Sequence, residues 1–158
     1  MAAAREPTRW TFHDATLLHL FPITYLLHLT EEWVVAAPIA LWTERMERPL
    51  AAVSFLALNA MGLVLMAIGI RLVRRGARFH WIVPALATAV LLNTAGHLVG
   101  SSFVGTYSAG LITAVILWVP LGLLTLIRVW DQATTRTLAA GVIVGVAVEL
   151  VVVTTLRL

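Results

Sequence analysis

The chain has 158 residues, of which 60% are hydrophobic and 12% are charged, and its formal net charge is +3. Because a typical soluble domain is about 45–50% apolar and about 25% charged, this composition excludes an ordinary soluble domain and indicates an integral membrane protein. The positive charge comes from eleven arginines that lie mostly in loops beside the apolar segments, so we expect no nucleic-acid partner. Cysteine is absent, which excludes disulfides and thiol chemistry.

Five apolar segments predict five membrane-spanning helices in an all-α bundle. A helix needs about 20 mainly apolar residues to cross a hydrocarbon core of roughly 30 Å, and its backbone groups must be satisfied inside lipid. The predicted spans are residues 15–42, 50–70, 81–99, 104–127 and 137–156. Too little chain lies between them for a second domain, so residues 1–158 are interpreted as a single transmembrane domain.

The first segment is longer than a perpendicular span requires. Pro22 and Pro38 each remove a backbone donor from it. A tilt, a kink or a short surface helix could each absorb the excess length, and the sequence leaves these alternatives open. No short apolar core with a small-residue cleavage site is present, so we expect the first helix to be retained rather than removed as a signal peptide.

The loop arginines predict the orientation of the bundle. One side of the membrane collects eight of them: Arg5, Arg9, Arg71, Arg74, Arg75, Arg78, Arg128 and Arg136. The other side has Arg45, Arg48 and Arg157. Cytoplasmic loops carry the excess of arginine, so we expect a cytoplasmic N-terminus and an outer C-terminus in a bacterial inner membrane. Residues 43–49 (TERMERP) and 100–107 (GSSFVGTY) are then the outer turns.

Polar residues inside the spans are the functional candidates, because a charge at the bilayer centre costs at least about 2.5–3.5 kcal/mol. The set comprises His28, Glu31 and Glu32 in the first span, Asn59 in the second, Asn93 and His97 in the third, and Glu149 in the fifth. At a rise of about 1.5 Å per residue, all of them fall in one layer near the middle of the bilayer or slightly outside it. Unrelated surface residues would not be expected to share a depth.

Helical spacing predicts that these residues face one cavity. Residues three and four apart share a helix face, so His28 can address both Glu31 and Glu32, and Asn93 lies beside His97. The alternatives are purely structural roles. His28 would then belong to a buried ion network, the asparagines would only form hydrogen bonds between helices, and His97 would be a polar residue with its hydrogen bonds satisfied.

The last span carries small residues at the same spacing as its acid. Gly141, Gly145 and Glu149 recur every four residues. Since small residues let helices approach closely in lipid, we expect this stripe to turn Glu149 toward the interior of the bundle.

The string His28-Leu29-Thr30-Glu31-Glu32 resembles the signature of the bacterial HXXEE-domain membrane proteins. That family is named for this pattern, and its biochemical function is poorly defined. The surrounding apolar helix, the later Asn93-x-x-x-His97 element and the chain length all suit one such domain.

A looser resemblance is to the emopamil-binding-protein group of sterol isomerases, in which a membrane helix carries His-Leu-x-x-Glu followed by an aromatic residue. Here the matching residues are His28, Leu29, Glu32 and Trp33. The resemblance implies a membrane-embedded His/Glu cavity that moves a double bond, with an aromatic ring near a cationic intermediate. Glu31, His97 and Glu149 depart from that pattern.

The favoured hypothesis is an enzyme that performs acid–base chemistry, without a cofactor, on a lipophilic molecule. Burial in an apolar cavity favours a protonated carboxyl group, and histidine exchanges protons near neutral pH. Glu31 or Glu32 would donate the proton with His28 as relay, and Glu149 or His97 would accept it. Isomerisation, cyclisation or epoxide opening of an isoprenoid-like substrate would fit this arrangement, as would hydrolysis.

Other side chains are expected to bind that substrate, which would enter sideways from the membrane lipids. Trp33 or Trp118 could stabilise a developing carbocation through its ring face. Tyr25, Asn59 and Asn93 would line the same cavity. For both tryptophans, simple packing is the alternative.

Two other functions stay open. Zinc or iron could be held by His28, Glu31, Glu32, His97 and Glu149, since His and Glu three or four apart on a helix can share a cation. A proton-coupled transporter is the less favoured alternative, because five helices without an internal repeat do not suit a secondary transporter. A homodimer would enlarge such a pathway.

Overall fold

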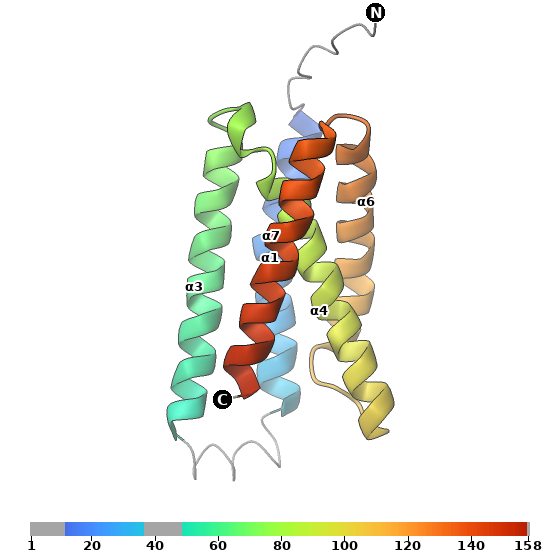
Figure 1. Ribbon diagram of the computed structural model, residues 1–158. Helices are drawn as coiled ribbons and strands as arrows, with labels where there is room; N and C mark the ends of the chain where they lie inside the picture. The colour runs from blue at the N-terminus through green and yellow to red at the C-terminus, as the bar shows by residue number, and fades with distance from the viewer. Residues whose placement is uncertain (1–11, 37–48, 158) are drawn as a thin grey trace, which may run out of the picture.

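The computed structural model describes residues 12–36 and 49–157, which form a bundle of antiparallel and parallel helices (Figure 1). The long helices are α1 (Phe12–Ala36), α3 (Pro49–Val73), α4 (Ile82–Val104), α6 (Val119–Trp130) and α7 (Thr135–Arg157). Between them lie η1 (Ala77–Phe79), α5 (Leu111–Thr113) and the π-helical turn η2 (Ala114–Trp118). No strand occurs in these two ranges, so the predicted five-helix, all-α bundle is confirmed.

Four helical segments are long and apolar enough to cross a membrane. They are Phe55–Val73, Ala77–Phe103, Leu111–Trp130 and Thr135–Thr155. α1 is not among these four because histidines and glutamates interrupt its apolar run, but its 25 residues extend roughly 37 Å. These lengths and compositions support an integral membrane protein.

The course of the chain places α4 at the centre of the bundle. α1, α4 and α7 run in one direction, whereas α3 and α6 return (Figure 1). α7 packs along α4, which also packs against η2 and α6. α1 contacts α3 on one side and the continuous α5–η2–α6 span on the other. Residues from α1 and α4 are therefore brought together beside the beginning of the α5–η2–α6 span.

The small-residue stripe of α7 is confirmed as a contact surface. A Cβ atom on Gly141 would lie 2.5 Å from the carbonyl oxygen of Trp81, and one on Gly145 would lie 2.7 Å from that of Ala85. Both contacts are closer than real side chains allow, so only glycine permits α7 to lie this near the α4 backbone. One turn further along, Glu149 faces α4, as the spacing predicted.

The predicted outer turn and the predicted start of the fourth span were both wrong in their boundaries. α4 continues past Gly100 to Val104, and the turn comprises residues 105–110. Ser102 lies within the helix, and its hydroxyl donates to the Leu98 carbonyl oxygen at 2.8 Å. Gly105 then ends α4 in a left-handed conformation, with its N–H donating to the Ser101 carbonyl oxygen at 3.0 Å.

Other boundary predictions fall partly outside the described residues. α1 begins at Phe12 and runs through Pro22 to Ala36, whereas Pro38 and the rest of the predicted first span lie outside. Of the predicted TERMERP turn only Pro49 is described. It is the first residue of α3, a position where the missing N–H of proline costs nothing.

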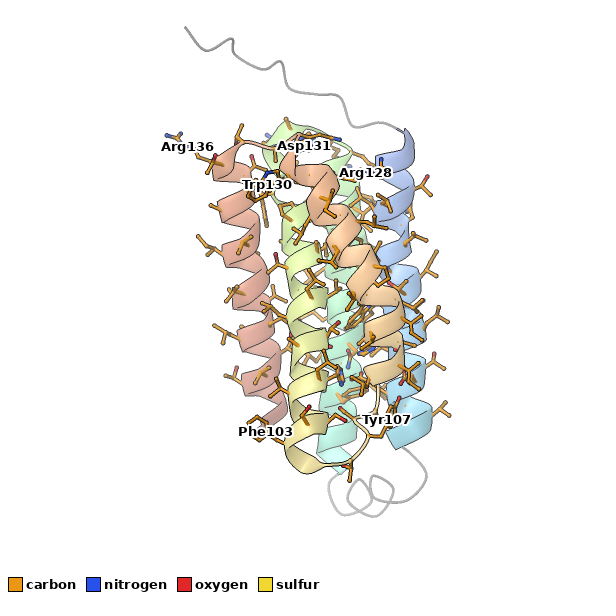
Figure 2. All side chains as sticks on the ribbon, turned by 90° about the vertical axis from the view of Figure 1, so that its right-hand side faces the viewer. Phe103, Tyr107, Arg128, Trp130, Asp131 and Arg136 are labelled. Atoms are coloured by element: carbon orange, nitrogen blue, oxygen red, sulfur yellow. The ribbon has the colours of Figure 1, made fainter. Side chains whose placement is uncertain are left out.

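The surface of the bundle has an apolar belt between its two ends. Large apolar side chains such as Ile127, Ile143 and Leu150 are more than half exposed, as expected of residues that face lipid. In Figure 2, Arg128 and Arg136 lie at one end of the bundle with Trp130, and Tyr107 lies at the opposite end.

Candidate functional site

Three of the predicted site residues converge between α1 and α4. His28 and Glu32 lie one turn apart on α1, and His97 projects from α4. The Nε2 atoms of His28 and His97 each lie 3.5 Å from the same oxygen, Oε1 of Glu32. Together these three side chains offer ligand atoms that all lie within 4.8 Å of one another. We refer to them as the His28–Glu32–His97 triad.

The other ring nitrogen of each histidine is held by a hydroxyl group. Nδ1 of His28 lies 3.0 Å from Oγ1 of Thr113, and Nδ1 of His97 lies 3.0 Å from Oγ of Ser108. Where each hydroxyl accepts from Nδ1–H, Nε2 carries a free lone pair directed at the centre of the triad. This pattern is typical of metal-binding histidines, whose outer nitrogen is oriented by a hydrogen-bond partner.

The segment from Gly105 to Thr113 covers the triad. Its closest approach is at Gly110, which has a left-handed φ of +92°. A Cβ atom there would lie 2.6 Å from Cε1 of His28, 2.9 Å from Cγ of Glu32 and 3.0 Å from Cε1 of His97. Two features thus require glycine at this position: the left-handed backbone conformation, and the lack of space for a Cβ atom.

Glu31 points away from the triad and fixes this covering segment. Its carboxylate accepts from the backbone N–H groups of Ile112 at 3.1 Å and Thr113 at 2.7 Å, and from the Tyr107 hydroxyl. The two amides belong to the first turn of the α5–η2–α6 span, whose N–H groups have no partner within the helix. Partial burial and the bond to Glu31 raise the pKa of Tyr107.

A second group of polar residues lies beside the triad. The Tyr25 hydroxyl donates to Oδ1 of Asn59 at 2.7 Å, and Nδ2 of Asn93 lies 3.5 Å from Oε2 of Glu149. The indole of Trp118 lies over the His28 ring, with 3.9 Å between ring centroids, and stacks on Tyr25 at 6.1 Å. We call Tyr25, Asn59, Asn93, Trp118 and Glu149 the second layer.

The structure therefore divides the predicted single cavity. The prediction that His28 addresses both acids of its motif holds for Glu32, whereas Glu31 binds the covering segment. Glu149 is paired with Asn93 rather than placed in the triad. Trp33 belongs to neither group, since its ring stacks on Phe55 with centroids 6.5 Å apart and is 39% exposed.

Sequence reasoning missed the residues that position the triad: Ser108, Gly110 and Thr113. A signal was present in the run from Gly105 to Thr113, where two glycines and four hydroxyl side chains follow directly after His97 and its helix. The incorrect boundary at residue 104 assigned most of this run to a regular helix, in which these hydroxyls would not face His28 and His97.

The comparison with known proteins identifies the sequence pattern. A family model described as "Protein of unknown function with HXXEE motif" matches residues 19–125. The chain belongs to this family. The HXXEE match extends from α1 into α6 and so contains the whole triad and its covering segment, whereas α7 and Glu149 lie beyond it. No curated protein and no solved structure matches the chain.

The geometry gives each residue of the HXXEE motif a separate contact. His28 and Glu32 are four apart and share the face that meets His97. Glu31 is turned by about 100° from Glu32, since an α-helix has 3.6 residues per turn, and it meets the amides of α5 instead.

Proposed function

We propose that this HXXEE protein is a membrane-embedded metalloenzyme in which His28, Glu32 and His97 hold one divalent ion, with zinc favoured over iron. The observation that carries the proposal is the convergence of two Nε2 atoms on one carboxylate oxygen, while both Nδ1 atoms are held by hydroxyls. Buried histidines that only served packing would not require this paired orientation.

The distances within the triad support a shared cation better than direct hydrogen bonds. An N–H···O bond is ordinarily about 2.7–3.2 Å long, whereas both Nε2–Oε1 distances are 3.5 Å. Ligands about 2.0–2.1 Å from a tetrahedral zinc ion lie about 3.3–3.4 Å apart. The same bond lengths at right angles, as in an octahedral iron site with two histidines and a carboxylate, give about 2.9 Å. Both distances to Glu32 Oε1 are closer to the tetrahedral value, which supports zinc.

Three protein ligands suit a catalytic rather than a structural ion. Structural zinc sites are closed by four protein ligands, whereas catalytic sites keep one position for water or substrate. A zinc ion at such a site acts as a Lewis acid and lowers the pKa of bound water to about 7, which supplies a nucleophile or a base at neutral pH. This chemistry favours epoxide opening or hydrolysis among the acid–base reactions that the sequence suggested.

The surroundings of the triad support a lipophilic substrate. The triad lies inside a bundle whose outer surface is apolar, and His28 is only 2% exposed. A substrate would therefore reach it from the lipid phase rather than from water. Arg128 and Arg136 lie at the end of the bundle opposite Tyr107 (Figure 2), which supports an orientation with that end in the cytoplasm of a bacterial inner membrane.

A metal-free proton relay through the same triad is the second candidate. It is favoured by the indole of Trp118, whose ring lies 3.9 Å from that of His28. An aromatic face stabilises a neighbouring cation, and a relay would convert His28 into a cation whereas zinc requires the neutral imidazole.

Metal analysis of protein purified in lipid nanodiscs, without chelators and after incubation with zinc, separates the two candidates. We expect about one zinc per chain in the wild type and little in H97A or E32Q. H19A is the matched control, because His19 lies on the same helix with an exposed side chain. Wild-type protein that retains no more zinc than H97A would contradict the metal proposal and leave the relay.

A further inference from the structure

The second layer lies about one helical turn from the triad, on the side of the helix starts of α1 and α4. Tyr25 precedes His28 by three residues and Asn93 precedes His97 by four, and α1 and α4 run in the same direction (Figure 1). Both residues are thus displaced by roughly 4.5–6 Å toward the same end of the bundle. The Trp118 ring contacts both Tyr25 and His28, so it joins the two levels.

Two buried polar atoms of the second layer lack a hydrogen-bond partner among the described residues. One is a donor, Nε1 of Trp118, whose residue is only 2% exposed. The other is an acceptor, Oδ1 of Asn93, whose amide nitrogen is already directed at Glu149. Because buried polar groups in proteins are nearly always paired, an unpaired donor and an unpaired acceptor within the second layer indicate a ligand group that supplies both partners.

The available partners define the chemistry of that group. The indole N–H requires an acceptor, whereas Asn93 Oδ1 requires a donor. A carbonyl or an ether would satisfy only Trp118, and an ammonium group would satisfy only Asn93. A hydroxyl group is the simplest group that both accepts and donates.

We infer that the second layer binds the hydroxyl group of a lipophilic alcohol, with Trp118 donating to its oxygen and Asn93 accepting its proton. As the substrate assignment of this site, the inference rests on the proposed function. It places the reacting carbon roughly 4.5–6 Å from the hydroxyl, which is the separation between the two levels along the helix axes. The substrate class is therefore a lipophilic alcohol whose reactive centre lies a few bonds from the hydroxyl.

The test measures binding of tritiated farnesol to the protein in nanodiscs, with unlabelled farnesol, farnesyl methyl ether and farnesene as competitors. We expect the alcohol to compete about five- to tenfold better than the ether, which cannot donate, because one hydrogen bond contributes about that much. W118F keeps an aromatic ring but removes the N–H, and N93L removes the acceptor. Each substitution should reduce the ratio by which farnesol competes better than farnesene, by about five- to tenfold.

The same samples distinguish failure of this inference from failure of the metal proposal. W118F and N93L should retain zinc, since neither residue is a triad ligand, and H97A should lose zinc but keep the preference for alcohol. Equal competition by alcohol, ether and hydrocarbon in the wild type would overturn the inference, whatever the zinc content. A preserved alcohol preference in folded W118F and N93L would overturn it as well.

Discussion

Substitution of Gly110 by alanine tests the geometry of the triad most directly. The added Cβ atom would lie within 3.0 Å of a side-chain carbon of each triad residue, His28, Glu32 and His97. It can be accommodated only if these three side chains spread apart. Binding of a metal would draw the three side chains together again and restore their clash with the Cβ atom. The clash therefore destabilises the metal-bound state.

The magnitude follows from two contributions. Overpacking of a close-packed site costs about 1–3 kcal/mol. The left-handed backbone at φ +92° adds about 1–2 kcal/mol for any residue with a Cβ. Only the first contribution opposes metal binding, and 1.4 kcal/mol corresponds to tenfold in affinity. We therefore expect G110A to bind zinc about 5- to 150-fold more weakly than the wild type.

Gly105 provides the matched control for this substitution. Its φ is +69°, so alanine is strained there too, but a Cβ atom would meet no other atom within 4 Å. Zinc affinity would be measured by competition with a fluorescent chelator in nanodiscs, with circular dichroism to verify that each variant is folded. G105A should bind zinc as the wild type does. Equal zinc affinities of folded G110A and G105A would refute the placement of Gly110 against the triad.

Three further substitutions probe the partners of the site. T113V removes the hydroxyl beside His28 Nδ1. Zinc affinity in the chelator assay should therefore fall about 10–100-fold. An unchanged affinity would show that Thr113 does not orient the His28 ring. E31Q weakens the bonds to the first turn of α5 and should lower the stability to thermal unfolding by about 1–3 kcal/mol, yet keep zinc, whereas E32Q should lose zinc. G145V would force α7 from the α4 backbone and should yield little folded protein by size-exclusion chromatography, in contrast to G96A, where a Cβ meets nothing within 4 Å.

Much of the architecture follows from the sequence because lipid leaves few alternatives. Apolar length alone predicts the five helices, and the cost of buried charge draws attention to His28, Glu32 and His97. The use of Gly145 for a close helix contact follows equally from the advantage of small residues in lipid, although the sequence does not identify the partner helix. These predictions depend on the period of one helix and on a shared depth in the membrane, both of which can be read from a single chain.

The division of the polar residues into two levels could not be predicted in the same way. It depends on which helices are neighbours and on the turn in which each one ends. Gly100 and Gly105 are equally plausible ends for α4 by sequence, and the choice of Gly105 determines whether Ser108 and Gly110 reach the triad. The pairing of Asn93 with Glu149 similarly depends on α7 lying beside α4 rather than beside α3.

The structure also explains why the motif contains two adjacent acids rather than one. A metal ligand on α1 must be three or four residues from His28 to share its face, and in the structure Glu32 is the acid that meets His28 and His97. The covering segment comes from the other side of α1, where only the preceding residue can reach the amides of Ile112 and Thr113. The Thr30 hydroxyl between His28 and these acids donates to the Leu26 carbonyl oxygen of its own helix at 2.8 Å. The two neighbouring glutamates thus have different partners: Glu32 belongs to the triad, and Glu31 binds the covering segment. One turn of α1 therefore positions both the triad and the segment that covers it.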